Sequence, residues 1–297
     1  MDLKLLLWLQ EHRWDTAAEI FSKITFGANE LVIIVIALLA YWCFSRRYGR
    51  RILLTMTLTL WLGQFLKILA ASERPWVRDS RIQPYADSKK DALGYSFPSG
   101  HTSTAAAVYG GLVHRKGLSA VWKVLAWTFV ALVAFSRMYL GVHTPQDVLV
   151  GLAIGIGMVA VCEPLARLAE KNAAGTLLVW GGVFVCGLAT IAVVVLKGIV
   201  ELDENTLDTV KTSGAVAAIG LGGWLESRFV RFEPPAALWK GLARIALGTA
   251  VGIALLELTK GFFVAALGEV AGGFVRYFVT CLWTVFGWPL IFKKAGL

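Results

Sequence analysis

Apolar runs about as long as a membrane-crossing helix recur along most of this chain. A helix needs roughly 20 residues to cross the hydrocarbon core of a bilayer, with a range of about 17–25. Nine runs approach that length, at residues 30–45, 52–71, 100–114, 120–140, 145–163, 175–197, 212–230, 239–263 and 269–292. Glycines and charges weaken the run at 212–230, so eight spans is the alternative. The pattern predicts an all-α, polytopic membrane bundle with eight or nine transmembrane helices.

The composition agrees with a membrane protein and argues against other classes. Of the 297 residues, 57% are hydrophobic and 16% are charged, which is less charge than a soluble domain carries. The net charge of +9 is explained by basic loops beside a membrane. No basic stretch has the aromatic pattern of a nucleic-acid module, so we expect no nucleic-acid partner. The four cysteines lie in apolar runs without CxxC spacing, which predicts neither a disulfide nor a metal site.

The distribution of the runs predicts three segments. Residues 1–29 combine an apolar face with interrupting charges, which is typical of amphipathic helices lying on a membrane surface. Residues 30–165 hold every chemically distinctive motif, and residues 166–297 add further spans. The role of that last segment stays open, with lipid entry and homodimerisation as two alternatives. Small residues in the fifth run predict close helix packing at Gly151, Gly155 and Gly157.

Lysines and arginines in short loops predict the orientation, because such loops are enriched in positive charge on the cytoplasmic side. If the spans alternate, most basic clusters fall on one side, namely Arg46–Arg51, Arg115–Lys116, Arg167–Lys171, Arg228–Lys240 and Lys293–Lys294. The loop at 198–211 on the other side is acidic, whereas the loop at 72–97 opposes the bias with five cations. We take the basic side as cytoplasmic and expect a multi-pass protein of a prokaryotic plasma membrane.

The same alternation brings three polar motifs to the opposite, extracytoplasmic face. The motif residues stand at four helix ends: Lys67 near the end of the second run, Ser99–His101 at the start of the third, Arg137 at the end of the fourth and His143–Asp147 at the start of the fifth. Residues scattered from 67 to 147 are therefore expected to form a single site.

Two cations of the first motif are candidates for binding phosphate oxygens. Lysine inside a span is costly, which makes Lys67 a functional candidate, although a lysine reaching the interface explains the same position. The guanidinium of Arg74 offers paired N–H donors that match the oxygens of phosphate. Pro75 ends any helix at this point and turns the chain.

The second motif, Pro98-Ser99-Gly100-His101, precedes a helix rich in alanine and threonine. Unpaired backbone N–H groups at a helix start, together with the helix dipole, form an anion site. Gly100 allows a ligand to approach the backbone closely. His101 then stands at the rim of that site, where it is suited to give a proton to a leaving oxygen. A plain helix cap beside an incidental histidine is the alternative.

The third motif runs from Ser136 to Asp147 and combines a cation with a histidine and a carboxylate. Arg137 is a further candidate for binding phosphate. Thr144, Pro145 and Asp147 have the spacing of a helix cap, a first-turn proline and a capping-box acid. Asp147 also stands where its carboxylate can reach His143 Nδ1 and stabilise the cation formed when Nε2 attacks phosphorus. These two roles compete for one carboxylate, and we favour the second.

Taken together, K-x6-RP (Lys67, Arg74, Pro75), PSGH (98–101) and SR-x5-H-x3-D (Ser136, Arg137, His143, Asp147) resemble the three signature motifs of the type-2 phosphatidic-acid phosphatase superfamily. The resemblance covers residues 30–165, and every motif position matches. It implies that His143 forms a phosphohistidine, that Asp147 orients it and that His101 protonates the leaving group. It further implies that no metal or other cofactor takes part and that the phosphate oxygens are held by Lys67, Arg74, Ser99, Gly100 and Arg137.

The expected function is therefore that of an integral-membrane lipid phosphatase acting at the extracytoplasmic face. Candidate substrates are a polyprenyl diphosphate, phosphatidic acid, phosphatidylglycerol phosphate and a sphingoid phosphate. One alternative is a phosphotransferase that passes the same phosphoryl group to a lipid or sugar acceptor. A second alternative is a transporter or scaffold whose phosphatase pocket is inactive, which complete motifs argue against.

Overall fold

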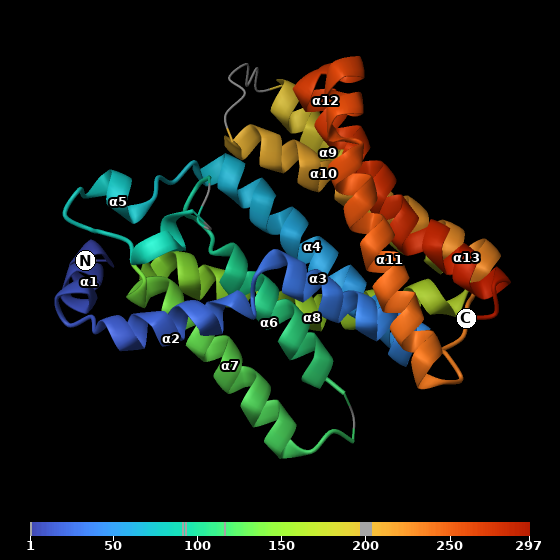
Figure 1. Ribbon diagram of the computed structural model, residues 1–297, viewed down its shortest axis with the longest axis horizontal. Coiled ribbons are helices and arrows are strands. Elements are labelled where there is room, and N and C mark those ends of the chain that lie inside the picture. Colours follow the sequence, from blue (N-terminus) through green and yellow to red (C-terminus); the bar gives the residue numbers. More distant parts are fainter. Residues whose placement is uncertain (1, 91, 93, 116, 197–203) are drawn as a thin grey trace. The chain divides into compact units, whose positions relative to one another are not determined.

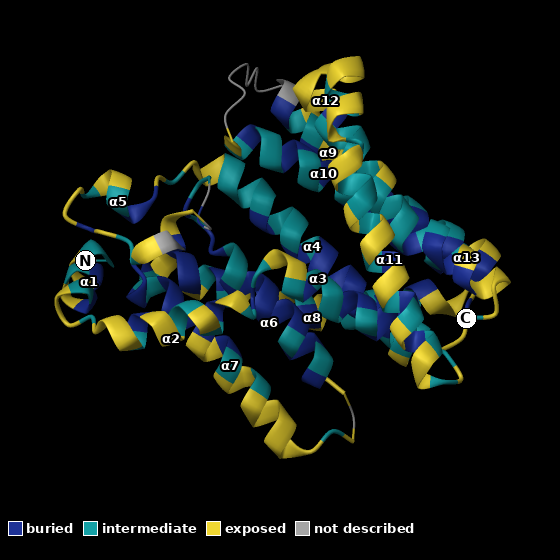
Figure 2. Cartoon of the chain, in the orientation of Figure 1, coloured by how far each residue is buried: buried dark blue, intermediate teal, exposed yellow. Residues whose placement is uncertain are grey.

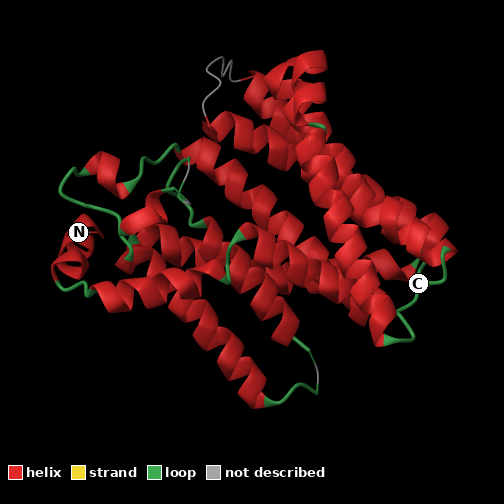
Figure 3. Ribbon diagram, viewed as in Figure 1, coloured by secondary structure: helices red, strands yellow, loops and turns green. Residues whose placement is uncertain are grey.

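The computed structural model describes residues 2–90, 92, 94–115, 117–196 and 204–297. All regular secondary structure in these residues is helical (Figures 1 and 3), so the predicted all-α fold is confirmed. The α-helices are α1 (Asp2–Glu11), α2 (Asp15–Phe26), α3 (Glu30–Leu39), α4 (Arg46–Ala70), α5 (Pro75–Arg78), α6 (Gly100–Val113), α7 (Ala120–Tyr139), α8 (Pro145–Lys171), α9 (Ala173–Leu196), α10 (Glu204–Leu225), α11 (Leu238–Leu258), α12 (Lys260–Leu282) and α13 (Trp288–Lys294). The short elements are the 3-10 turn η2 (Ala86–Lys89) and the π-helical turns η1 (Ala40–Phe44), η3 (Glu226–Val230) and η4 (Trp283–Gly287).

Six helices in the described residues are long and apolar enough to cross a bilayer, and a seventh span is counted if α2 and the bent segment from α3 through η1 form one span. The predicted number of eight or nine is therefore not confirmed. The run at 100–114 forms only the 14-residue α6, which is too short to cross the hydrocarbon as a straight helix. The run at 212–230 belongs largely to α10, whose first half is polar and which is not among the six.

The chain divides into two compact units. The first comprises Met1–Ile34 and Leu62–Ala160, and the second comprises Val35–Trp61 and Val161–Leu297. Every residue of the three motifs belongs to the first unit. The boundaries predicted at residues 29 and 165 stay a prediction, and the acidic loop predicted at 198–211 lies partly outside the described residues.

In the first unit, α8 packs tightly against α6 because two glycines of α8 face its backbone. A Cβ atom added to Gly151 would lie 2.8 Å from the Ser99 carbonyl oxygen, and one added to Gly155 would lie 2.5 Å from the Ser103 carbonyl oxygen. Both distances are far below van der Waals contact, so these positions require glycine, as predicted. Gly157 has no atom within 4 Å of such a Cβ, so the predicted close packing does not extend to it. The start of α6 and the start of α8 are thereby held together.

The helices α1 and α2 pack against α7 in the same unit. Leu6 and Leu9 of α1 are buried in a cluster with Tyr139 and Leu140 at the end of α7. The amphipathic pattern of residues 1–29 is therefore used at least in part for packing on protein. Their location at a membrane surface stays a prediction.

Much of α7 is exposed along its first half, as the yellow residues in Figure 2 show. The exposed side chains are large and apolar and include Val121, Trp122, Val124 and Leu125. A soluble protein rarely exposes such a continuous apolar surface, whereas a lipid-facing helix requires one. This exposure and the six apolar helices identify an integral membrane protein.

The second unit is held by α9, α10 and α12, which pack on one another, and by a buried arginine. Arg244 is 4% exposed, and its Nη1 donates to the Trp42 carbonyl at 2.7 Å and to the Glu233 carbonyl at 2.9 Å. Its guanidinium lies 4.1 Å from the centre of the Phe292 ring. Its Nη2 donates to the Leu297 carbonyl oxygen at 2.6 Å, so backbone oxygens and an aromatic face together stabilise this buried cation.

Candidate active site

The residues predicted for the site stand at five helix ends in the first unit. Lys67 lies in the last turn of α4, Arg74 directly precedes α5, and Ser99 directly precedes α6. Arg137 lies in the last turn of α7, and Asp147 lies in the first turn of α8. The Ser99 backbone N–H donates to the Asp147 carbonyl at 3.0 Å, which joins the second motif to the third.

The turn between α7 and α8 fixes the position of His143. Gly141 follows the end of α7 with φ of +75°, a left-handed conformation that glycine adopts without strain. The backbone N–H groups of Val142 and His143 then both donate to the Arg137 carbonyl at 3.1 Å. His143 is 3% exposed as a result, and its ring is enclosed by the turn and its neighbours.

One carboxylate oxygen of Asp147 accepts two hydrogen bonds and lies close to the His143 ring. Its Oδ2 accepts hydrogen bonds from the Ser96 hydroxyl at 2.6 Å and from the Thr144 backbone N–H at 2.8 Å, and it lies 3.5 Å from His143 Nδ1. The Asp147 backbone N–H in turn donates to Thr144 Oγ1 at 3.3 Å, which completes a capping box. The two roles weighed for this carboxylate are therefore compatible, because the cap holds Oδ2 beside the imidazole.

The other ring nitrogen of His143 faces a cation. Arg74 Nη1 lies 3.0 Å from His143 Nε2 and 3.2 Å from the Val142 carbonyl oxygen, to which it donates. Arg74 Nε donates to the Gly94 carbonyl at 2.8 Å. An arginine has no acceptor, so Nε2 carries the lone pair and the proton belongs on Nδ1, toward Asp147. Nε2 is thus the ring nitrogen with a free lone pair, and the Arg74 guanidinium lies beside it.

Burial lowers the pKa of the His143 imidazole below its usual range, the cation of Arg74 lowers it further, and the Asp147 carboxylate opposes both. Because its pKa is lowered, the imidazole of His143 is neutral at neutral pH. A neutral imidazole has a free lone pair on Nε2, which is the form that a nucleophile requires.

The start of α6 leaves room for an anion. The Ser99 hydroxyl is buried and contacts Thr102 Oγ1 at 3.0 Å, so it does not cap the helix. A Cβ atom added to Gly100 would meet no atom within 4 Å. Open space therefore adjoins the first backbone N–H groups of a 14-residue helix, which is the arrangement that binds phosphate.

His101 and the remaining cations lie around that space. The partly exposed imidazole of His101 interacts electrostatically with Arg137, His143, Lys67 and Arg74. The structure thus brings both histidines and three cations into one cluster within the first unit. Arg137 is 1% exposed and its Nη1 donates to Thr25 Oγ1 of α2 at 3.0 Å.

Two residues at this site were missed by the sequence analysis. Ser96 lies in the loop before the second motif and binds Asp147, and Thr25 lies in α2 and orients Arg137. Neither belongs to a motif or a periodic pattern, and Thr25 is 112 residues away from its partner. A serine two residues before the proline of PSGH is the sole sequence signal for Ser96.

Comparisons with known proteins identify the family of this chain. Residues 48–171 match the model of the PAP2 superfamily, and residues 210–297 match a model described as a PAP2 superfamily phosphatase transmembrane extension. The chain is also 31% identical to phosphatidylglycerophosphatase B of Bacillus subtilis over 150 residues, which cover 46% of this chain and 70% of that protein. This chain belongs to the PAP2 superfamily. The resemblance drawn from the three motifs is therefore confirmed.

Other relatives of this PAP2 protein act on different lipids, according to their names. It is 32% identical to lipid phosphate phosphatase delta of Arabidopsis thaliana, over 40% of this chain and 31% of that protein. It is 31% identical to undecaprenyl-diphosphatase of Sulfolobus acidocaldarius, over 44% of this chain and 61% of that protein. The chain therefore spans less than two thirds of the length of these two relatives. A crystal structure of Aquifex aeolicus LpxE aligns with a TM-score of 0.45 and 23% identity, over 55% of this chain and 94% of that one.

Replacing Ser96 by alanine tests whether this hydroxyl positions the Asp147 carboxylate. Hydrogen bonds to charged groups contribute about 1.5–3 kcal/mol, so we expect phosphatase kcat to fall roughly tenfold to a hundredfold. The freed Oδ2 would interact more strongly with His143 and raise its pKa. The acid limb of the kcat/KM profile, where activity is lost as His143 becomes protonated, should therefore move to higher pH.

Ser103→Ala is the matched control for Ser96→Ala, because the Ser103 hydroxyl donates to the Gly100 carbonyl at 3.0 Å within α6. We expect its pH profile to be unchanged. A Ser96→Ala enzyme with reduced kcat and an unshifted acid limb would show a merely structural role for this hydroxyl.

Proposed function

We propose that this protein is a membrane-embedded lipid phosphatase that works through a phosphohistidine. The observation that carries the proposal is the environment of His143, whose Nε2 faces Arg74 at 3.0 Å while its Nδ1 lies 3.5 Å from Asp147. A histidine oriented by a carboxylate and placed among cations is equipped to attack phosphorus. The names of the relatives support a lipid phosphate as the substrate.

In the first step, His143 Nε2 attacks phosphorus, a P–N bond forms and the P–O bond to the leaving group breaks. Arg74 releases Nε2 and binds an equatorial oxygen, where it and the other cations stabilise the transferring phosphoryl group. His101 gives its proton to the leaving oxygen. In the second step, water gives a proton to His101 and attacks the phosphohistidine, the P–N bond breaks, and phosphate leaves. Asp147 stabilises the imidazolium character of His143 throughout.

We further propose that the reaction occurs at the extracytoplasmic face of a plasma membrane. The support is the excess of lysine and arginine in the loops at the other ends of the apolar helices. A site at helix ends can receive a head group while the acyl or prenyl chain stays in the bilayer. A thiol reagent that does not cross membranes tests this orientation in intact cells. It should label a single cysteine introduced into the loop at 72–97.

Release of free phosphate tests the proposed activity. Purified full-length protein in detergent should release inorganic phosphate from one or more members of a panel containing a polyprenyl diphosphate, phosphatidic acid, phosphatidylglycerol phosphate and a sphingoid phosphate. A strict requirement for an added lipid or sugar acceptor would instead identify a phosphotransferase. If none of these substrates releases phosphate, with or without an acceptor, the protein would instead be an inactive transporter or scaffold.

Chelation should leave the activity unchanged. Lys67, Arg74 and Arg137 supply the positive charge that balances the phosphate oxygens, so we expect the rate in excess EDTA to stay within about 20% of the untreated rate. The check is initial-rate phosphate release before and after dialysis against EDTA. Inhibition that is reversed by added Mg²⁺ or Zn²⁺ would contradict the proposed mechanism.

A further inference from the structure

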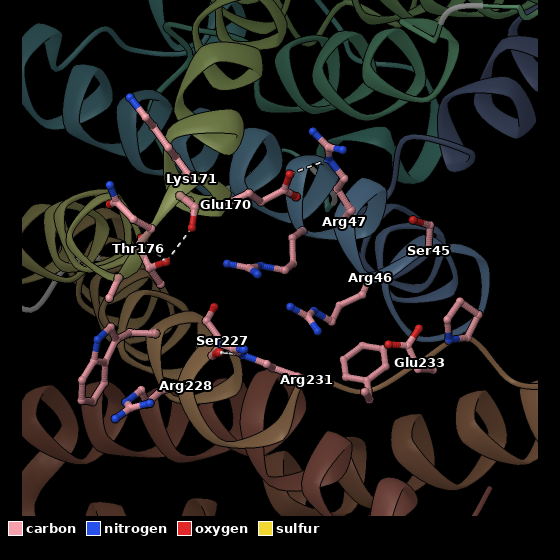
Figure 4. A pocket seen from close by; sticks show the side chains of 17 residues that line it. Ser45, Arg46, Arg47, Glu170, Lys171, Thr176, Ser227, Arg228, Arg231 and Glu233 are labelled. Carbon is pink, nitrogen blue, oxygen red and sulfur yellow. Dashed lines mark hydrogen bonds and ion pairs between the residues drawn. The ribbon is translucent and has the colours of Figure 1, made fainter.

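A cavity of about 720 Å³ lies within the second unit, and none of the residues that line it is used by the mechanism (Figure 4). Its walls come from the start of α4, the end of α8, the start of α9, η3 and the segment that follows η3. Six cations line it: Arg46, Arg47, Arg50, Lys171, Arg228 and Arg231.

Positive charge in the cavity exceeds the negative charge available to neutralise it. The lining carboxylates are Glu170, which pairs with Arg47, and Glu233. The buried Glu226 beside the cavity lies 3.5 Å from Arg46. The other four cations form no ion pair within the residues that the structure describes. An excess of this kind attracts an anion to a partly enclosed space.

Arg50 is the strongest single indication of a ligand. Its side chain is 6% exposed, and its Nη2 has no hydrogen-bond partner among the described residues. The guanidinium lies 5.4 Å from the centre of the Trp180 ring, which fixes its position. A buried charged donor without an acceptor is unfavourable, and an anion bound in the cavity would supply that acceptor.

The remaining arginines approach from a second wall. Figure 4 shows Arg46 extending from α4 into the cavity, with Arg228 and Arg231 on the facing segment and Lys171 pointing away from the middle. Arg231 has φ of +49°, and its Nε donates to the Ser227 carbonyl at 2.8 Å. That bond holds the plane of the guanidinium while its two terminal nitrogens stay available as paired donors, the geometry that suits phosphate oxygens.

The residues that line the cavity and the residues of the catalytic motifs occur on two common helices but are different residues. Arg46, Arg47 and Arg50 lie in the first turns of α4, whose last turn holds Lys67. Lys171 ends α8, whose first turn holds Asp147. Each of these helices has 25 or more residues, a length that crosses a bilayer. The cavity is therefore not a part of the candidate active site.

We propose that this cavity is a second, non-catalytic phosphate-binding site, which takes the phosphate group of an anionic phospholipid or of a soluble phosphate. Basic pockets between transmembrane helices are suited to lipid head groups, and the same donors would bind inorganic phosphate. The proposal does not depend on the proposed phosphatase activity.

The test measures binding to the full-length protein by native mass spectrometry in detergent. The probes are dihexanoylphosphatidylglycerol, dihexanoylphosphatidylcholine and inorganic phosphate. The double variant Arg228→Gln/Arg231→Gln removes two cavity cations, and Arg167→Gln/Lys294→Gln removes two exposed cations of the same unit that do not line the cavity. The catalytic residues are identical in all three proteins, so differences in binding report on the cavity.

We expect the cavity variant to bind an anionic probe at least tenfold more weakly than wild type, and the control variant to bind it equally well. Loss confined to dihexanoylphosphatidylglycerol identifies a lipid head group, and loss for inorganic phosphate identifies a soluble phosphate. Unchanged binding of both anions, or equal weakening in the control variant, would overturn the proposal.

A single substitution keeps the test decisive if the double variant does not fold. Arg228 is exposed, so Arg228→Gln alone should fold normally, and we expect at least a threefold loss of affinity from it. Phosphate release from a lipid substrate by all the variants should equal that of wild type. Full affinity in Arg228→Gln together with an unfolded double variant would count against the proposal.

Discussion

Replacing His143 by alanine should abolish phosphate release, with a fall in kcat of at least about four orders of magnitude. Enzymes lose rate on this scale when the attacking group itself is removed. His143 Nε2 is the group at this site with a free lone pair, a carboxylate behind its other nitrogen and a cation beside it. No acceptor concentration should restore the rate, because a phosphotransferase would need the same nitrogen.

The His143→Ala protein should still fold. Arg74 loses one partner but keeps the carbonyls of Gly94 and Val142. The pKa of the buried His143 imidazole is lowered in the folded protein. As the pH falls through the ordinary histidine range, the unfolded chain therefore binds a proton that the folded protein does not, and this destabilises the fold. The alanine variant lacks this group, and its free energy of unfolding should therefore depend less on pH between about 4 and 6.5.

Trapping of the phosphoenzyme distinguishes the loss of the nucleophile from other causes. Acid-quenching would destroy a phosphohistidine, so the enzyme is quenched in alkaline denaturant after mixing with substrate labelled in the phosphate. Wild type should carry label and His143→Ala should carry none. His12→Ala is the matched control, because His12 is exposed in the turn between α1 and α2, where its ring stacks on Trp8 and its Nδ1 lies 2.8 Å from the Trp8 carbonyl oxygen. Label on the His143→Ala protein would refute a phosphohistidine at this position.

The local capping signals explain why the catalytic helix ends could be predicted from sequence. Thr144 and Asp147 form the cap of α8, because these side chains bind nearby backbone groups whatever the rest of the chain does. Ser99 directly precedes α6 as predicted, although its hydroxyl contacts Thr102 and not the helix backbone. Alternation of the spans then placed Arg137 and His143 near the same helix ends. The all-α fold and the family followed from these residues and from the apolar runs.

The features that could not be predicted from the sequence depend on tertiary structure. The length of α6 is set by where its chain turns after Val113, and the apolar run alone did not show that this helix has only 14 residues. Ser96 is buried against Asp147 by a loop without any periodic pattern, and Thr25 meets Arg137 because α2 packs on α7. In the sequence, the cations of the second unit indicate only basic loops on the cytoplasmic side. Their arrangement around one cavity required the packing of α4, α8, α9 and η3.

Replacing His101 by alanine should slow the reaction in a way that depends on the leaving group. General acid catalysis contributes about 10²–10⁴-fold, and the contribution is largest when the leaving oxygen is strongly basic. A lipid alcohol needs a proton to leave, whereas a nitrophenolate needs almost none. We expect formation of the phosphoenzyme from an alkyl phosphate to slow by about 10²–10⁴-fold, and formation from an aryl phosphate to slow by less than about tenfold.

The rate to measure is the first turnover and not kcat. In the proposed second step His101 would also accept the proton of the attacking water, so the steady-state rate should fall for every substrate. Rapid mixing followed by alkaline quenching isolates the first step, and the aryl phosphate should give labelled enzyme that accumulates because its hydrolysis is slow. His143→Ala is the contrasting variant, since a better leaving group cannot replace a missing nucleophile.

The position of His101 gives a physical reason for this division of roles. It lies in the first turn of α6 next to the open space at Gly100 and is partly exposed, whereas His143 is buried together with the Asp147 carboxylate. A proton donor must exchange protons with water between turnovers, and a nucleophile must be shielded from protonation. Equal slowing of the first step for alkyl and aryl phosphates would show that His101 binds the phosphate and does not protonate the leaving oxygen.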